Sequence, residues 1–137
     1  MSADVDAAAA GPARRWAEVW TRAWPLGDTD EIAALYADDA TYRALAFRDP
    51  DLGLAGVRRY LDTNFAVEQE TECWFGEPVV TGDRAAVEWW GTWVEQGQRL
   101  TLAGATFLRF DDEGLVVDHR DYWNEVERRE PPYDGWF

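Results

Sequence analysis

The sequence has few of the residues that build disulfides, metal sites and cationic surfaces. It contains one cysteine, Cys73, and one histidine, His119, and all 13 basic residues are arginines, so lysine is absent. A single cysteine cannot form a disulfide within the chain, and one cysteine with one histidine is too few for a Cys/His metal site. No stretch approaches the run of about 18 apolar residues that a membrane-spanning helix needs. Because cysteine and histidine are so few, we expect no bound metal, and we expect no other cofactor.

Negative charge, by contrast, is abundant. The 27 acidic residues give the chain a formal net charge of −14. Nucleic acids and anionic membranes bind clustered positive charge, so this excess argues against both as partners. Asp4 and Asp6 stand where a secretory signal would carry positive charge. We interpret residues 1–12 as a flexible leader and expect a cytoplasmic protein.

Hydrophobic periodicity predicts helices early in the chain and strands later. The 137 residues suit a single domain, and Trp16, Trp20 and Trp24 recur at helical spacing within a helix over 13–24. Asp28 and Glu31 form a capping box that begins a second helix, which we expect to end at 38–39. A short strand over 41–47 and a third helix over 54–65 follow. Period-two patterning then predicts strands at about 72–80, 85–95, 99–110 and 115–123.

This order predicts an α+β fold. We expect a cone-shaped α+β barrel, with three N-terminal helices packed on a curved, mixed and mainly antiparallel sheet. The concave apolar space of such a cone is where a small molecule binds.

Three segments resemble the nuclear transport factor 2-like superfamily in its SnoaL-like branch. They are residues 24–42, with the pairs Leu35-Tyr36 and Asp38-Asp39, residues 53–61, and residues 114–124, which are similar to the closing strand of SnoaL-like cyclases and limonene epoxide hydrolase. The resemblance implies a SnoaL-like domain over 13–124, with a C-terminal tail over 125–137. The superfamily holds isomerases, dehydratases, cyclases, hydrolases and non-catalytic binders, so the fold alone does not choose among them.

The resemblance makes Asp121 the first catalytic candidate. In the similar segment of those enzymes the aspartate points into the cavity and acts as an acid or a base. Alternation along a strand places His119, Asp121 and Trp123 on one face. A carboxyl group in an apolar pocket has a raised pKa, which suits proton transfer. The alternative is a structural aspartate that is bound by Arg99 or by a backbone amide.

Arg99 and His119 complete the predicted catalytic set. The hydrolase has Arg-x-Asp where this chain has Arg99-Leu100-Thr101, so the arginine matches and the second carboxylate, which shares the hydrolase's water-activating mechanism, does not. One carboxylate, one guanidinium and one hydroxyl suit deprotonation beside a carbonyl or binding of an anionic substrate. A surface position is the alternative for Arg99. His119 suits a general base, and a buried structural histidine is the alternative.

The match of Arg99-Leu100-Thr101 to the hydrolase pattern also decides which faces of the strands we expect to line the cavity. We expect Arg99 and Thr101 to face inward. The alternate residues then face outward, beside Trp89 and Trp93; they are Leu100, Leu102, Thr106 and Leu108. The substrate-binding candidates are Thr101, Trp90, Trp123, Tyr42 and Glu88.

An apolar outer row needs a cover, for which we expect a second subunit, making a homodimer through the outer sheet face. The C-terminal tail is the alternative cover. The sequence thus predicts a SnoaL-like protein that binds a small hydrophobic molecule and is a candidate for cofactor-independent isomerisation, dehydration, cyclisation or hydrolysis. The alternative is a non-catalytic ligand-binding or oligomerisation module of the same fold.

Overall fold

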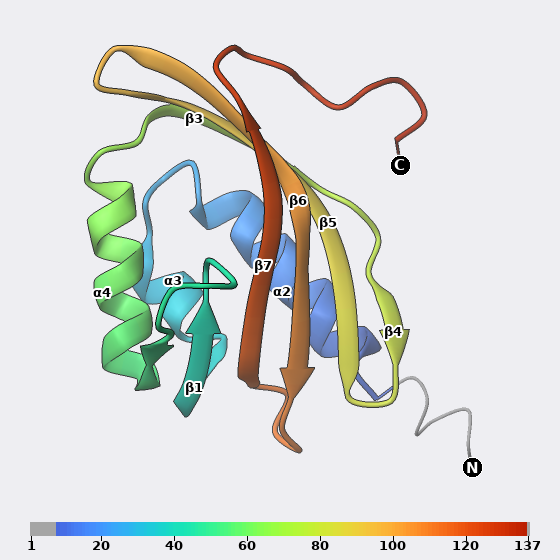
Figure 1. Ribbon diagram of the computed structural model, residues 1–137. Coiled ribbons are helices and arrows are strands. Elements are labelled where there is room, and N and C mark those ends of the chain that lie inside the picture. The colour runs from blue at the N-terminus through green and yellow to red at the C-terminus, as the bar shows by residue number, and fades with distance from the viewer. Residues whose placement is uncertain (1–7, 137) are drawn as a thin grey trace.

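Three helices precede or interrupt the sheet in the computed structural model, which describes residues 8–136 (Figure 1). They are α2 (Ala10–Ala23), α3 (Thr29–Ala33) and α4 (Gly53–Phe65). Trp16 and Trp20 lie on the buried face of α2, as their spacing predicts. The side chain of Asp28 accepts a hydrogen bond from the Glu31 amide at 3.1 Å, so the predicted cap begins α3. Within the described residues, no helix is long and apolar enough to cross a membrane.

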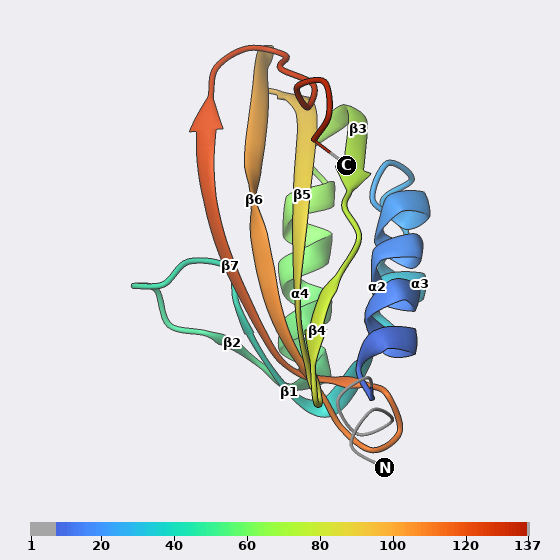
Figure 2. The same ribbon diagram turned by 90° about the vertical axis from the view of Figure 1, so that its right-hand side faces the viewer.

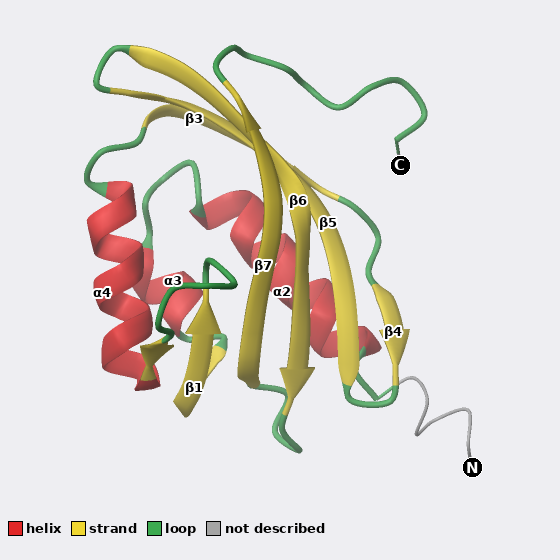
Figure 3. Ribbon diagram, viewed as in Figure 1, coloured by secondary structure: helices red, strands yellow, loops and turns green. Residues whose placement is uncertain are grey.

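The seven strands form one curved, unclosed sheet (Figure 3). Six of them follow the order β2-β1-β7-β6-β5-β3, and β4 pairs with β5. The β1–β7 pair is parallel and the others are antiparallel, which confirms a mixed and mainly antiparallel sheet. The strands are β1 (Tyr36–Arg43), β2 (Asp51–Leu52), β3 (Gln69–Phe75), β4 (Val79–Thr81), β5 (Arg84–Glu95), β6 (Gln98–Phe110) and β7 (Val116–Val126).

Several predicted boundaries are wrong. The second helix ends at Ala33 rather than at 38–39, because Tyr36 already begins β1 and bonds into the sheet. A register shift between Tyr36 and Thr41 interrupts the alternation there and hides the strand from a period-two search. The expected strand over 72–80 is divided into β3 and β4, since Pro78 has no N–H with which to continue the ladder.

Two elements extend past the limits that we predict for the domain. Helix α2 begins at Ala10, inside the expected leader, and β7 runs to Val126, inside the expected tail. Residues 1–7 of the predicted leader lie outside the described residues.

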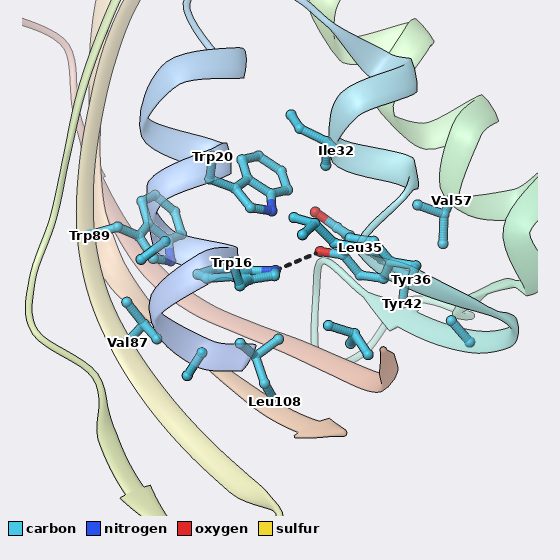
Figure 4. Packing of buried hydrophobic residues seen from close by; sticks show 14 of the residues in the cluster. Trp16, Trp20, Ile32, Leu35, Tyr36, Tyr42, Val57, Val87, Trp89 and Leu108 are labelled. Atoms are coloured by element: carbon cyan, nitrogen blue, oxygen red, sulfur yellow. Dashed lines mark hydrogen bonds between the residues drawn. The ribbon is translucent and has the colours of Figure 1, made fainter. Parts of the chain in front are cut away.

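The helices lie on one side of the sheet, where tryptophans fill much of the space between the layers (Figures 2 and 4). The ring of Trp24 lies 5.8 Å from Trp89 and 5.9 Å from Trp93. A Cβ atom on Gly91 would come within 2.3 Å of the Trp24 ring, so only glycine permits this approach of β5 to the end of α2. Tryptophan packing thus fixes the distance between the helices and the sheet.

The C-terminal tail packs on the opposite face of the sheet. Trp90 makes edge contacts with Tyr133 and Trp136 at ring distances of 6.1 and 6.3 Å. The hydroxyl of Thr101 donates to the Arg128 carbonyl at 2.6 Å and accepts from the Glu130 amide at 3.0 Å. The tail therefore covers part of the outer face, which is the alternative to a second subunit that the sequence left open.

Candidate functional site

A cavity of about 370 Å³ lies between the helices and the inner face of the sheet. Its walls are mostly aromatic. Six of the nine tryptophans line it: Trp16, Trp20, Trp24, Trp89, Trp93 and Trp123. A concave, largely apolar space with a few polar groups is typical of a small-molecule site.

Strand β7 brings Asp121 to the inner wall. Alternation along the strand directs His119, Asp121 and Trp123 into the cavity. Register then places Thr106 of β6 opposite Asp121. The Asp121 side chain is only 10% exposed, and the His119 side chain is 1% exposed. The site is therefore a carboxylate and an imidazole in aromatic surroundings.

Two chains of hydrogen bonds converge on one oxygen of Asp121. In the first, Trp89 Nε1 donates to Thr106 Oγ1 at 2.8 Å, and that hydroxyl donates to Asp121 Oδ1 at 2.6 Å. In the second, His119 Nε2 lies 2.8 Å from the same Oδ1. Because a carboxylate oxygen only accepts, Nε2 carries the proton in this bond. The carboxylate is therefore oriented from both β6 and β7.

The second chain continues through Tyr36 to helix α2. The Tyr36 hydroxyl lies 2.8 Å from His119 Nδ1 and accepts from Trp16 Nε1 at 3.1 Å (Figure 4). With a neutral imidazole protonated on Nε2, Tyr36 donates to Nδ1 and every donor in the chain has an acceptor. Tyr42 stacks on the imidazole at a ring distance of 3.7 Å and an interplanar angle of 16°. Both ring nitrogens and one ring face of His119 are thus engaged.

Tyrosine hydroxyls supply further donors. Tyr42 and Tyr60 line the cavity, 4.7 Å apart between ring centroids, and within residues 8–136 neither hydroxyl has a hydrogen-bond partner. Burial raises the pKa of both hydroxyls, and the negative charge of Asp121 raises it further. Both groups therefore stay protonated at neutral pH and can donate to an oxygen of a bound molecule.

Glu68 adds a second carboxyl group to the cavity lining. It follows α4 in the chain and accepts a hydrogen bond from Trp24 Nε1 at 2.8 Å. Burial raises its pKa to about 7, the Trp24 bond opposes this shift, and the nearby charge of Glu95 adds to it. The sequence pattern does not indicate Glu68, because a residue in a turn carries no periodicity that predicts where its side chain points.

The described residues hold no group of three or more histidine, cysteine, aspartate or glutamate side chains arranged for a metal ion. The side chains that line the cavity supply carboxyl, imidazole, hydroxyl and indole groups.

Comparison with known proteins matches residues 13–119 to the SnoaL-like domain. The chain belongs to the SnoaL-like domain family. This places it in the nuclear transport factor 2-like superfamily that the sequence resembles.

Solved structures share the fold. The epoxide hydrolase/cyclase-like enzyme SalBIII, which acts in pyran ring formation in the polyether salinomycin, has a TM-score of 0.73 at 21% identity, over 83% of this chain and 91% of SalBIII. An LEH-like epoxide hydrolase of Mycobacterium tuberculosis has a TM-score of 0.70 at 20% identity, over 84% of each chain. A hypothetical protein of Catenulispora acidiphila with a ketosteroid isomerase-like fold, in complex with trimethylamine, has a TM-score of 0.69 at 20% identity, over 78% of this chain and 83% of that one. At these identities the likeness shows the fold alone.

Within this SnoaL-like fold, the predicted site residues divide between the two faces of the sheet. His119, Asp121, Trp123 and Tyr42 line the cavity. Arg99, Thr101, Trp90 and Glu88 do not. The structure thus brings together two members of the predicted catalytic set and leaves the third outside.

The predicted positions of Arg99 and Thr101 are wrong. Arg99 donates to the Glu70 carbonyl at 3.2 Å and lies 3.7 Å from the Glu70 carboxylate. Thr101 is held by the tail. The inner row of β6 instead contains Leu100, Leu102 and Thr106. The hydroxyl that binds Asp121 is therefore that of Thr106, an odd number of residues from Thr101 and so on the opposite face.

The predictions for β5 are reversed for the same reason. Trp89 and Trp93 face the cavity rather than the outside. Trp90 contacts the tail, and the exposed Glu88 accepts from Trp136 Nε1 at 3.4 Å. The apolar rows of β5 and β6, which we expect on the outer face, instead form the inner wall of the cavity. Apolar side chains are more stable packed against the helices than exposed to water.

Proposed function

We propose that this protein binds a small hydrophobic molecule in the aromatic cavity and that Asp121 acts on it as a general base. One observation carries the proposal. Oδ1 of Asp121 accepts hydrogen bonds from both Thr106 and His119, while no residue within 8–136 donates to Oδ2. A carboxylate that is fixed through one oxygen and unengaged at the other is prepared to accept a proton from a bound molecule.

The surrounding residues have distinct roles in this proposal. His119 positions Asp121, since its Nε2 proton is committed to Oδ1. Tyr42 and Tyr60 donate to the substrate oxygen on which negative charge develops. Trp123 and the other tryptophans exclude water, which strengthens these interactions. The reaction class is proton transfer without a cofactor, as in isomerisation, dehydration, cyclisation or hydrolysis.

The contacts of Arg99 do not favour the alternative of a non-catalytic binding module. It would be favoured by a carboxylate neutralised in an ion pair with Arg99, but among the described residues Arg99 binds Glu70 instead. The fold that this chain shares with the epoxide hydrolase/cyclase-like enzyme SalBIII and with an LEH-like epoxide hydrolase is compatible with catalysis, and the geometry at Asp121 carries the catalytic proposal.

A homodimer and a cytoplasmic location also belong to the proposal. The support for the dimer is now the exposed pair Phe107 and Tyr122, which pack edge to face at 5.8 Å on the outer side of the sheet. Sedimentation equilibrium that detects only a 15.6 kDa species would exclude the dimer.

Deuterium exchange tests the catalytic proposal without knowledge of the natural substrate. A panel of hydrophobic ketones is incubated with the protein in D2O, and proton NMR follows the loss of the signals next to the carbonyl. We expect the wild type to accelerate exchange for some members, and Asp121→Asn to lose about a hundredfold or more of this rate. Asp118→Asn is the matched control, since Asp118 lies on the same strand and pairs with Arg43 and Arg120 instead. Unchanged exchange in Asp121→Asn would remove Asp121 from the mechanism, and binding without exchange would favour the non-catalytic alternative.

A further inference from the structure

Charge in the cavity is strongly one-sided. Four carboxyl groups line it, those of Asp121, Glu68, Glu95 and Glu125, against the single guanidinium of Arg48. Arg48 is already paired with Asp51 at 2.8 Å and lies over the Tyr60 ring at 5.7 Å. A bound anion would meet uncompensated negative charge, whereas a bound cation would be attracted.

Two of these carboxyl groups are bound to indoles of the cavity wall. Trp24 Nε1 donates to Glu68 at 2.8 Å, and Trp93 Nε1 donates to Glu95 at 3.2 Å. The two indole rings lie 5.9 Å apart. Glu68 and Glu95 are also near enough to repel each other, since the charge of Glu95 contributes to the raised pKa of Glu68. We call these four residues, Trp24, Trp93, Glu68 and Glu95, the carboxylate–indole cage.

The cage has the composition that binds an organic cation. Indole faces attract cations through their quadrupole, and quaternary ammonium groups are recognised in aromatic cages. A cation between Glu68 and Glu95 would also relieve their mutual repulsion.

A second observation points to a ligand beside the cage. Trp20 lines the same cavity and is only 7% exposed, and its indole N–H makes no hydrogen bond of normal geometry among the described residues. This N–H lies close to the Tyr36 hydroxyl, where it opposes the effect of burial on the pKa of that group. The Trp20 ring packs edge-on against Trp24 at 5.8 Å. A buried donor without a hydrogen bond of normal geometry is costly, so this N–H suits an acceptor oxygen on the bound molecule.

Register separates the cage from the proposed base. Thr106, which binds Asp121, pairs with Val87 on β5, and Glu95 lies at the far end of that strand, eight residues further along. The cage and Asp121 therefore occupy different parts of one cavity, so that one part binds a ligand's charged end while the other faces its body.

We infer that the cavity selects an organic ammonium compound with a hydrophobic body and an acceptor oxygen, and that the carboxylate–indole cage binds its ammonium group. The inference deepens the proposed function and rests on it, because it names the substrate class of the same cavity. It also replaces the anionic substrate that Arg99 suggested, since Arg99 lies outside the cavity.

A pair of isosteric esters tests this inference. Benzoylcholine has an aromatic body, an ester oxygen and a trimethylammonium group, and 3,3-dimethylbutyl benzoate replaces the charged nitrogen with carbon. Titration calorimetry of the full chain is expected to show at least tenfold tighter binding of benzoylcholine. Glu95→Gln and Glu68→Gln should each reduce this preference, whereas Glu113→Gln, an exposed residue of a turn, removes the same charge and should not.

The outcomes separate the inference from the proposed function. Equal or tighter binding of the neutral ester overturns the inference alone, and so does an unchanged preference in both cage variants. Binding of neither ester overturns the inference, and the deuterium-exchange assay then decides the proposed function separately. Asp121→Asn should lose proton transfer and keep the preference for benzoylcholine. Loss of that preference in Asp121→Asn would place the cation at Asp121 and overturn the assignment of the cage.

Discussion

Replacement of Glu68 by glutamine should change the pH dependence of stability. Burial raises the pKa of Glu68 from its ordinary value of 4.5 to about 7, so the folded protein holds this proton more tightly than the unfolded chain does. A carboxyl group whose pKa is higher in the folded state than in the unfolded chain destabilises the folded state when it ionises. Its destabilising effect is therefore absent at low pH, develops as pH rises from about 4.5 to 7, and is complete above that range.

The shift in pKa sets the size of the effect. A displacement from 4.5 to about 7 corresponds to an upper limit of about 3 kcal/mol in the free energy of unfolding. Glu68 is only half-buried, and solvent screening reduces this to about 1 to 2 kcal/mol. Glutamine keeps an oxygen that accepts from Trp24 and removes the ionisation.

Urea unfolding followed by tryptophan fluorescence measures this difference. We expect Glu68→Gln to be close to wild type in stability at about pH 4, below the ordinary pKa of 4.5, and more stable by about 1 to 2 kcal/mol at about pH 8.5. Glu113→Gln controls for the loss of one negative charge from a chain with net charge −14. If Glu68→Gln and wild type differ by the same amount at both pH values, Glu68 is not a buried acid and the reasoning fails.

Two further substitutions test the packing and the hydrogen bonds around the cavity. Gly91→Ala should lower the free energy of unfolding by about 1 to 3 kcal/mol in the same urea assay, because its Cβ meets the Trp24 ring, whereas Gly11→Ala has open space and should be neutral or slightly stabilising. Equal effects at the two glycines would contradict the close approach. Thr106→Val should cost about 1 to 3 kcal/mol, because it leaves the buried Trp89 N–H without an acceptor, and Thr106→Ser should restore most of this loss. A valine variant as stable as the serine variant would show that the hydroxyl contributes nothing.

Much of the fold is predictable from local signals in the sequence. The Trp16 and Trp20 spacing predicts α2, and the Asp28 cap predicts where α3 begins. The point at which α3 ends is not predictable in this way, because Tyr36 pairs across the sheet with Val116, a residue far away in the chain. Pairing between distant segments overrides the helical pattern there.

The residues of the candidate site can be predicted only on a strand whose cavity-facing side is identified correctly. Alternation on β7 places His119 and Asp121 together, and the structure has them so. On β6 the alignment with an Arg-x-Asp pattern selected the wrong face, whereas the apolar row of Leu100 and Leu102 is the better guide to the inside. Glu68 could not be found from sequence, since its burial depends on a contact with Trp24, which lies at the end of α2 and far from Glu68 in the chain.

The convergence of both hydrogen-bond chains on Oδ1 also determines which groups can react. His119 cannot take a proton from a substrate on either ring nitrogen without breaking a bond to Tyr36 or to Asp121. The chains begin at Trp16 of α2 and at Trp89 of β5, so the position of the carboxylate is fixed by both layers of the fold. A molecule in the cavity therefore meets Oδ2 of Asp121 in one orientation. This geometry assigns the base to Asp121 and a positioning role to His119, and it gives the tryptophan-rich core a direct part in the proposed chemistry.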